Sequence, residues 1–577
     1  MYIIGNSKSE IHLFKKGAGM MGYGMFFNTV KDAESKIFAR SFFINDPETN
    51  NNICFVNVEI CFITIAIKKG VVKKLKENHP DIPLNDHNLM ITAQHTHSAT
   101  GGYSEYPLYN ITIPGYIPDV LEKITEGITQ SIVIAFQSKQ KANLKYNTGE
   151  FEPEKEVAFN RSIKAYNQNP EVTKKTEQEK HLAVDRKMRL LRIDDSNQQP
   201  IGMINWFGVH CTSISNDNHK ISSDNKGYAS SFFENKFASK EHPFTGIFAQ
   251  EASADVSPCF IWDKKKKWNR GKYEDDFESA RYNGKLQMEK AYDIFNSGVN
   301  NTLLKGSIDH AIMYVDFSNV IPDSEFTNNY KNARTGPSCH GVAFFAGTDE
   351  GPGMSSILKN ISILCTKVVK GYEIIKSLFM SSEYKKMIKE KYRIHGRKDI
   401  LMETAKGRIL GTDNIKNFFI PSWIDLNIKY FKTYHRNGSL TGKPWIPQIL
   451  PIQLLIIGPI AIVGIPGEIT TIAAKRLRST ILKVLVKRGV NEIILSPFAN
   501  AYCGYITTYE EYQVQSYEGG HTVYGEWTLA AFQSKYKELA EKLLLTPEKR
   551  KFPAVRPVVF TNEELEKRSF ISPKKNI

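Results

Sequence analysis

The most lipophilic segment of the chain, residues 449–465, limits the folds that the sequence can build. It reads ILPIQLLIIGPIAIVGI, which falls short of the roughly 20 apolar residues that a helix needs to cross a bilayer. Pro451, Gln453 and the pair Gly458-Pro459 also interrupt it. A Gly-Pro pair between two apolar runs is typical of a turn, so we expect two buried strands joined there. No segment of the sequence is predicted to span a membrane.

Strand and helix patterns alternate along the rest of the chain. Residues 53–67 are a second apolar run that predicts a buried strand, and residues 469–487 have the amphipathic spacing of a helix. This alternation predicts the α/β class. The 577 residues would allow several average domains, but the polar stretches are interpreted as surface loops inside one unit. We therefore expect one large domain with mixed β-sheets flanked by helices, residues 1–550, and a C-terminal tail, residues 551–577.

The chain is basic, with 76 Lys+Arg against 61 Asp+Glu and a net charge of +15. Net charge indicates solubility and non-specific attraction rather than fold or chemistry. Basic residues gather at 264–267 and 385–398, and a solvated surface is the favoured interpretation. Attraction to an anionic membrane surface or to another polyanion is the main alternative. No nucleic-acid-binding module is recognisable, so we expect no nucleic-acid partner.

The cysteines and the N-terminal residues indicate which classes of protein the chain does not belong to. Seven scattered cysteines without a C-x-x-C pair argue against a disulfide scaffold and a zinc finger. They are interpreted as small buried apolar residues. Residues 1–10 lack the basic leader and apolar segment of a secretory signal. We expect a cytoplasmic protein, or one exported without such a signal, that can contact membranes peripherally.

Familiar catalytic signatures such as H-E-x-x-H and G-x-S-x-G are absent from the sequence. An active site would therefore have to be assembled from dispersed residues. The first candidate is QHTHSATGG, which contains His95 and His97. At positions i and i+2 of a strand, both side chains would point to one face and could reach one cation. Two unrelated histidines are the alternative.

Two further segments offer metal ligands. His210 ends the apolar segment NWFGVH, where it is either a ligand at a sheet edge or a core histidine, and the latter is more common. Its neighbour Cys211 is expected to point to the other face. Glu468 follows a Pro-Gly turn at the start of a predicted helix. It either interacts with the helix dipole or supplies an oxygen ligand that completes a two-histidine site.

The remaining candidates are a tyrosine-rich segment and a small-residue turn. The segment GYITTYEEY contains Tyr505, and YEGG begins at Tyr517. Their rings either pack or place a phenol beside a carbonyl or a metal. In QEASADVSP, Ser257 follows Asp255 by two residues. Turn chemistry alone explains many such segments.

Together these motifs resemble the neutral (non-lysosomal) ceramidase family. The resemblance extends over residues 2–546 and is specific, because many separate motifs occur in the same order. They are MGYG at 21–24, ARS at 39–41, QHTHSATGG, FNRS at 159–162, NWFGVHCTS, DNKGYAS at 224–230, ADVSP, GIPGE and GYITTYEEY with YEGG.

The resemblance implies a zinc ion at the bottom of a pocket. It implies four metal contacts, which are His95, His210, Glu468 and Tyr505. It places a second group of residues beside the water or the substrate, namely His97, Arg161, Tyr517, Gly22 and Asp255.

The implied reaction is hydrolysis of the amide of ceramide to sphingosine and a fatty acid. Zinc lowers the pKa of a bound water toward about 7 and polarises a carbonyl, and Tyr505 with Arg161 or His97 would stabilise the oxyanion. Ser257 is either the nucleophile or a substrate anchor, and we favour attack by water. A zinc hydrolase of another N-acyl lipid and a membrane-binding pseudoenzyme are the alternatives.

The sequence departs from the family in several places. Ala99-Thr100 stands where the family usually has Gly-Pro, and Cys211 and Cys259 replace other residues, which puts substrate preference in question before hydrolysis. Relatives usually carry a C-terminal immunoglobulin-like domain, and this chain is expected to lack it. Cys339 has no partner cysteine near residues 393–398, which favours a reducing compartment or a bacterial source.

Overall fold

The computed structural model describes residues 1–113, 115–237, 243–298, 302–415, 426–436, 438, 440 and 442–568. Its largest sheet has the strand order β13-β11-β10-β8-β1-β4-β5-β6, with β17 paired to β8. The sheet is mixed, because β5–β6 and β11–β13 are parallel while its other pairs are antiparallel. Its strands are β1 (Tyr2–Ile11), β4 (Ile37–Asn45), β5 (Asn52–Val58), β6 (Leu89–Ala93), β8 (Gln140–Glu150), β10 (Lys187–Asp195), β11 (Pro200–Trp206), β13 (Thr245–Ala249) and β17 (Thr302–Leu303).

A second sheet, β18-β24-β25-β27, contains the lipophilic segment. Its strands are β18 (Ile308–Asp316), β24 (Ile449–Ile457), β25 (Ile460–Gly464) and β27 (Glu492–Ser496). The predicted hairpin is confirmed, because β24 and β25 pair antiparallel on either side of Gly458. Gly458 has φ +54, and a Cβ there would lie 2.2 Å from the carbonyl oxygen of Lys305. Glycine is therefore required at this turn.

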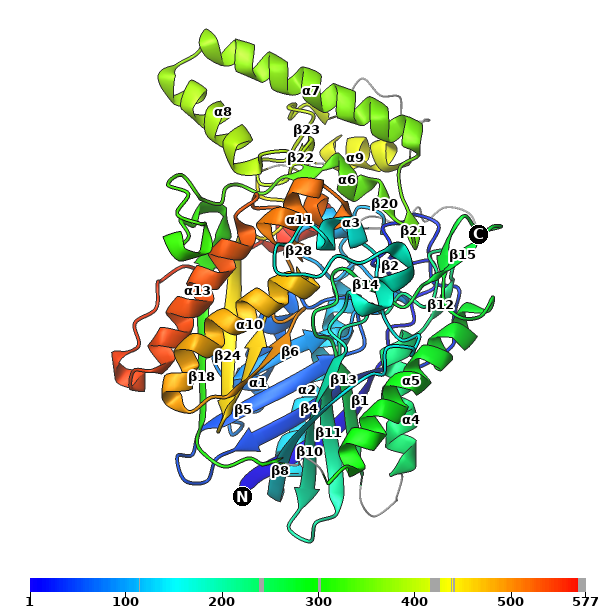
Figure 1. Cartoon of the computed structure of the whole chain (residues 1–577), viewed down its shortest axis with the longest axis vertical. Helices are drawn as coiled ribbons and strands as arrows, with labels where there is room; N and C mark the ends of the chain where they lie inside the picture. The colour runs from blue at the N-terminus through cyan, green and yellow to red at the C-terminus, as the bar shows by residue number, and fades with distance from the viewer. Residues whose placement is uncertain are drawn as a thin grey trace.

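Helices cover both sheets, which confirms the predicted α/β class (Figure 1). On the large sheet, α2 packs against β1 and β4 and also contacts α1, while α4 and α5 pack near β13 and β10. On the second sheet, α10 and α13 pack against β27 and β18. The helices are α1 (Ile65–Asn78), α2 (Pro118–Gln137), α4 (Asp224–Lys236), α5 (Asp276–Asn296), α10 (Thr471–Leu485) and α13 (Thr528–Leu543).

Two sequence predictions can be compared directly with these elements. The helix predicted over residues 469–487 is confirmed as α10. The strand predicted over residues 53–67 is wrong at its C-terminal end, because β5 stops at Val58 and α1 begins at Ile65. The reason is local. The Thr64 side chain accepts a hydrogen bond from the backbone N–H of Ile67 and caps the helix.

Helices α7 (Ser356–Leu378) and α8 (Ser382–His395) form a hairpin at the end of the molecule far from the large sheet (Figure 1). In the described parts of the chain, no helix is both long and apolar enough to cross a bilayer. The polar stretch around residue 265 forms the β15–β16 hairpin, β15 (Ile261–Asp263) and β16 (Trp268–Arg270). All seven cysteines are free thiols, and all except Cys365 are buried.

The segment that follows residue 550 contacts the rest of the structure. Phe560 is buried in the core around the second sheet. Helix α14 (Asn562–Arg568) ends at a buried arginine, whose Nη1 donates to the carbonyl oxygen of Glu105 over 2.7 Å. Residues 569–577 lie outside the described residues. The predicted division into a domain and a tail stays a prediction.

Candidate metal centre and active site

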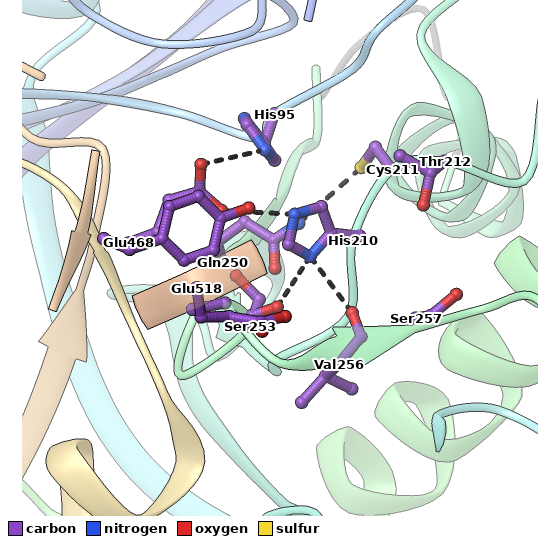
Figure 2. Close-up of polar contacts among 12 residues, drawn as sticks. His95, His210, Cys211, Thr212, Gln250, Ser253, Val256, Ser257, Glu468 and Glu518 are labelled. Carbon is purple, nitrogen blue, oxygen red and sulfur yellow. Dashed lines mark hydrogen bonds and ion pairs between the residues drawn. The ribbon is translucent and has the colours of Figure 1, made fainter. Parts of the chain in front are cut away.

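Three buried side chains from distant parts of the chain converge at the centre of the molecule. The Glu468 carboxylate lies 3.5 Å from Nε2 of His95 and 3.2 Å from Nε2 of His210. His95, His210 and Glu468 are 2%, 1% and 1% exposed. Their ligand atoms all lie within 4.8 Å of one another, and Figure 2 shows both rings facing the carboxylate. The residues present thus form the two-imidazole, one-carboxylate set that zinc sites use.

His95 is held by its backbone conformation and by one carbonyl. It lies two residues beyond β6 and has a left-handed φ of +77, so the prediction of a histidine on an extended strand is wrong there. Its Nδ1 donates to the carbonyl oxygen of Cys61 over 2.7 Å, and its ring stacks on Phe498 with centroids 4.1 Å apart. Because Nδ1 carries the proton, the lone pair of Nε2 is available to a cation.

His210 is oriented in the same manner. It lies four residues beyond the end of β11 rather than on the strand itself, and Nδ1 faces the carbonyl oxygens of Ser253 at 2.6 Å and Val256 at 3.1 Å (Figure 2). Burial lowers the pKa of His95 to about 4 and that of His210 to about 3. Both rings are therefore neutral near pH 7, which is the metal-binding form.

The described residues leave two of these buried ligand atoms without a hydrogen-bond partner. They are Nε2 of His210 and Oε2 of Glu468. A buried polar atom without a partner costs about 1–3 kcal/mol, and more when it is charged. A cation between the two residues would satisfy both atoms.

A pair of short parallel strands places Glu468 beside Tyr505. Strand β26 (Glu468–Ile469) pairs with β28 (Tyr505–Ile506), and these two residues are directly opposite in the register. The Pro-Gly turn before Glu468 permits the approach, because a Cβ on Gly467 would lie 2.7 Å from the carbonyl oxygen of Gly504. The Tyr505 hydroxyl accepts a hydrogen bond from Arg161 over 2.9 Å.

His97 lies beside the triad, in a space that Gly22 leaves free. Its Nε2 is 3.1 Å from Nε2 of His95, and its ring meets the Tyr23 ring edge-on at 4.7 Å. A Cβ on Gly22, which has φ +129, would lie 2.4 Å from Cγ of His97. Cys61, His95 and His97 form a second possible ligand group. Burial raises the pKa of the Cys61 thiol well above its usual value, so this thiol is protonated near pH 7.

Arg161 joins the candidate catalytic residues into one buried network. Its guanidinium forms ion pairs with Glu350 and, over 3.0 Å, with Glu518, besides its contact with Tyr505. Ser257 donates from Oγ to the Glu350 carboxylate. Arg161 and Ser257 thus share the Glu350 carboxylate, and Tyr505 joins them through its hydrogen bond with Arg161.

The local structure explains how Arg161 and Ser257 meet. Strand β9 (Phe159–Asn160) pairs with β14 (Val256–Ser257), which sets Ser257 opposite Phe159. A polar cavity opens at this point. It is lined by Phe159, Asn160, Arg161, Glu177, Lys180, Ser257, Cys259, Asn269, Asp349 and Glu350.

Two predicted substrate-binding residues have different surroundings. The Tyr517 ring lies 5.5 Å from the Tyr505 ring and 5.6 Å from the Arg161 guanidinium, beside the network. Asp255 instead accepts hydrogen bonds from Asn160 and from the backbone and hydroxyl of Thr471. Its carboxylate therefore holds the start of α10.

Sequence reasoning did not identify Glu350, Glu518 or Tyr502. Glu350 lies in the turn between β20 (Gly347–Thr348) and β21 (Gly351–Pro352), and an acidic pair inside GTDEGPG was the available signal. Glu518 follows Tyr517 in the YEGG motif, where the adjacent glutamate was the available signal. The Tyr502 hydroxyl donates to Oε1 of Glu468 over 2.5 Å, and nothing in its own segment indicated this contact.

Comparison with known proteins identifies relatives of this chain. Residues 2–412 and 434–534 match the family described as "Neutral/alkaline non-lysosomal ceramidase, N-terminal". Neutral ceramidase B of Dictyostelium discoideum is 30% identical over 572 residues, covering 94% of this chain and 71% of the relative. Neutral ceramidase of Pseudomonas aeruginosa is 30% identical over 550 residues, covering 94% and 72%.

Solved structures agree with this relationship. The structure titled "Ceramidase complexed with C2" aligns with a TM-score of 0.78 at 29% identity, covering 96% of this chain and 77% of that one. The crystal structure of the Pseudomonas aeruginosa neutral ceramidase aligns with a TM-score of 0.73 at 28% identity, covering 94% and 74%. The chain belongs to the neutral/alkaline non-lysosomal ceramidase family.

Proposed function

We propose that this protein is a zinc-dependent amidohydrolase that cleaves the amide bond of ceramide to sphingosine and a free fatty acid. The observation that carries the proposal is the buried set of His95, His210 and Glu468, in which Nε2 of His210 and Oε2 of Glu468 lie 3.2 Å apart and neither has a hydrogen-bond partner within the described residues. Nitrogen and carboxylate ligands of this kind suit zinc. When bound, zinc would activate water and polarise the amide carbonyl. Family membership supports ceramide as the substrate.

Arg161 and Tyr505 are proposed to stabilise the oxygen that becomes negative during hydrolysis. Burial raises the pKa of Tyr505 well above its ordinary value, so the phenol keeps its proton and can donate a hydrogen bond. The Arg161 guanidinium lies 2.9 Å from that hydroxyl and adds a fixed positive charge. Fixed donors of this kind in a water-excluded site stabilise a transition state strongly. Tyr505 is also proposed as the fourth metal contact.

His97 is proposed to position the attacking water. Burial lowers its pKa well below the ordinary value, so the ring is neutral and can hold a water by a hydrogen bond. Nδ1 of His97 has no hydrogen-bond partner within the described residues. Its Nε2 is 3.1 Å from Nε2 of His95, which places the ring beside the proposed metal.

Ser257 is proposed as an anchor for the substrate rather than as the nucleophile. Its Oγ donates to Glu350. Burial would raise the pKa of Glu350, but the charge of Arg161 and the hydrogen bonds from Ser257 and Arg161 hold this pKa below its usual value. A carboxylate that is so firmly ionised is a weak general base. The contact therefore supports attack by water, with the Ser257 hydroxyl orienting the substrate.

A fluorescent ceramide tests the proposal directly. We expect release of labelled fatty acid, loss of release on chelation with recovery on added zinc, and loss in Glu468→Ala. Metal analysis should find about one zinc per chain in the unmutated protein and less in the variant. Glu538→Ala is the matched control, because Glu538 is an acidic residue on the outer part of α13.

Other outcomes decide between the alternatives. Hydrolysis that survives both chelation and Glu468→Ala would exclude the zinc mechanism. Hydrolysis of another N-acyl lipid but not of ceramide would favour the broader hydrolase. Absence of turnover with every N-acyl lipid would favour the membrane-binding pseudoenzyme. We also propose that the protein contacts anionic membranes peripherally, because its proposed substrate, ceramide, is a membrane lipid.

A further inference from the structure

Helix α7 buries four polar residues and exposes many of its apolar ones, whereas an ordinary surface helix buries its apolar face. Its fully buried residues are Ser362, Thr366, Glu373 and Ser377. Several large aliphatic residues face solvent, and Leu364 and Val368 are 63% and 64% exposed. We define the α7 apolar face as Ile357, Ile361, Leu364, Val368, Tyr372 and Ile375, all of which are exposed.

The α7 apolar face is one continuous stripe. At 100° per residue its members fall within an arc of about 80°, and the buried polar residues fall on the opposite side of the helix. From Ile357 to Ile375 the stripe is about 27 Å long. The turn that follows extends it, because Phe379 is 83% exposed and Met380 is 50% exposed. An apolar surface of this extent is typical of an interaction site.

Basic side chains lie beside the stripe on α7 itself. At 100° per residue, Lys367 and Lys376 fall on either side of the α7 apolar face, and both are exposed. Lys385, Lys386 and Lys389 are exposed in the N-terminal part of α8, which follows the turn with Phe379 and Met380. Acidic residues offset little of this charge, because Glu373 is buried in an ion pair with Lys391 and Glu390 pairs with Arg393, which leaves Glu383 as the exposed carboxylate of the two helices. The surface is therefore apolar along its centre and positive along its edges.

These features match a lipid bilayer better than a protein. A helix with an apolar face and flanking lysines lies in the membrane interface, with its apolar side chains among the acyl chains and its lysines near anionic headgroups. The hairpin is also connected closely to the proposed active site. Only residues 351–355 separate Glu350, which contacts Ser257 and Arg161, from the start of α7.

We propose that the α7 apolar face, with Phe379 and Met380, docks this protein onto anionic lipid bilayers. The inference rests on the proposed function for its purpose, since ceramide would be taken from such a bilayer. It identifies the part of the chain that makes the contact. The cluster at 385–398 contributes only its outward lysines, because Lys391 and Arg393 are in ion pairs and Lys398 donates to buried carbonyl oxygens.

Sedimentation with phosphatidylcholine vesicles, with and without phosphatidylserine, tests the docking. We expect binding to the anionic vesicles and weaker binding to the neutral ones. Leu364→Glu/Val368→Glu should weaken binding to anionic vesicles by about tenfold or more, because two aliphatic side chains lose their burial. Ile321→Glu/Val559→Glu is the matched control. It adds the same charge at residues that are 74% and 70% exposed outside the hairpin, and it should bind as the unmutated protein does.

Activity measurements distinguish a failure of the docking proposal from a failure of the proposed function. Leu364→Glu/Val368→Glu should lose hydrolysis of ceramide in vesicles but keep hydrolysis of a short-acyl, water-dispersed ceramide. Vesicle binding that depends on the α7 face, without hydrolysis of any N-acyl lipid by the unmutated protein, would reject the function and leave the docking intact.

Three results would overturn the docking itself. The first is equal vesicle binding by the Leu364→Glu/Val368→Glu variant. The second is equal binding to neutral and anionic vesicles, which would remove the role of the lysines. The third is a dimer in light scattering that the same substitutions dissociate, because the face would then be covered by a second copy of the chain.

Discussion

Replacing Arg161 by methionine tests whether one buried cation holds the proposed active site together. The substitution keeps an unbranched apolar stem and removes the guanidinium. It abolishes the ion pairs with Glu350 and Glu518 and the hydrogen bonds to Tyr505 and to the carbonyl oxygen of Ala254. Four segments of the chain lose a shared partner.

The structure gives the size of the effect. Side-chain exposure is 8% for Arg161 and 4% for each of its two carboxylate partners, so solvent screens little of the lost attraction. Removing one partner of a buried ion pair costs about 3–5 kcal/mol. Glu350 would keep hydrogen bonds from Ser257 and Thr212, but hydroxyl groups do not replace a charge. A loss of about 4 kcal/mol corresponds to roughly a thousandfold change in the unfolding equilibrium.

The effect should depend on pH with a definite sign. The pKa of folded Glu350 is lowered, chiefly because Arg161 outweighs the raising effect of burial. The carboxylate thus contributes stability that is present above its unfolded pKa of about 4.3 and is lost as pH falls through the folded pKa. Without Arg161, burial dominates and the folded pKa rises. The destabilisation by Arg161→Met should therefore be larger at pH 8 than at pH 5.

Urea unfolding with excess zinc, followed by fluorescence at both pH values, measures this effect. Arg281→Met is the matched control. Its pair with Glu34 leaves the arginine side chain 45% exposed, and exposed pairs contribute only about 0–1 kcal/mol. An Arg161→Met protein as stable as the control, or one destabilised equally at both pH values, would refute the reasoning. Hydrolysis should fall in Arg161→Met and persist in Arg281→Met.

Three other outcomes follow from single features. Gly22→Ala would place a methyl 2.4 Å from Cγ of His97 and should lower kcat by roughly a hundredfold. Gly24→Ala has nothing within 4 Å of its Cβ and should lower kcat much less. Similar losses in the two variants would contradict the packing argument. Ser257→Ala should raise KM more than it lowers kcat if Ser257 anchors the substrate, and complete loss of turnover would instead support a nucleophile. All seven cysteines are free, and only Cys365 is partly exposed. A thiol reagent should therefore titrate all seven cysteines in denaturant but about one in the folded protein. Fewer than seven titrated cysteines in denaturant would reveal a disulfide.

Local sequence patterns predicted a large part of the fold. The alternating apolar and amphipathic runs predicted the α/β class, and the Gly458-Pro459 pair predicted the hairpin of β24 and β25. The spacing of residues 469–487 predicted α10. These features depend on backbone preference and on residues close in sequence, so a short window of the chain contains the information.

The same patterns were less informative about the site. The residue types in QHTHSATGG, NWFGVH and GIPGE indicated candidate ligands, and the structure brings His95, His210 and Glu468 together. The sequence did not indicate that His95 has a left-handed φ. It also did not indicate that Tyr502 donates to Glu468. Both depend on how neighbouring segments pack.

By itself the sequence determined the class of fold and the residue types able to bind a metal. Only the tertiary structure decided which residues meet, since Glu350 reaches Ser257 across 93 positions and Arg161 reaches Tyr505 across 344. It also decided which side of α7 faces water. An amphipathic pattern shows that a helix has an apolar and a polar face, but not which face is buried. That depends on what packs against the helix. The fully buried residues of α7 are Ser362, Thr366, Glu373 and Ser377, so the α7 apolar face on its other side is exposed to water.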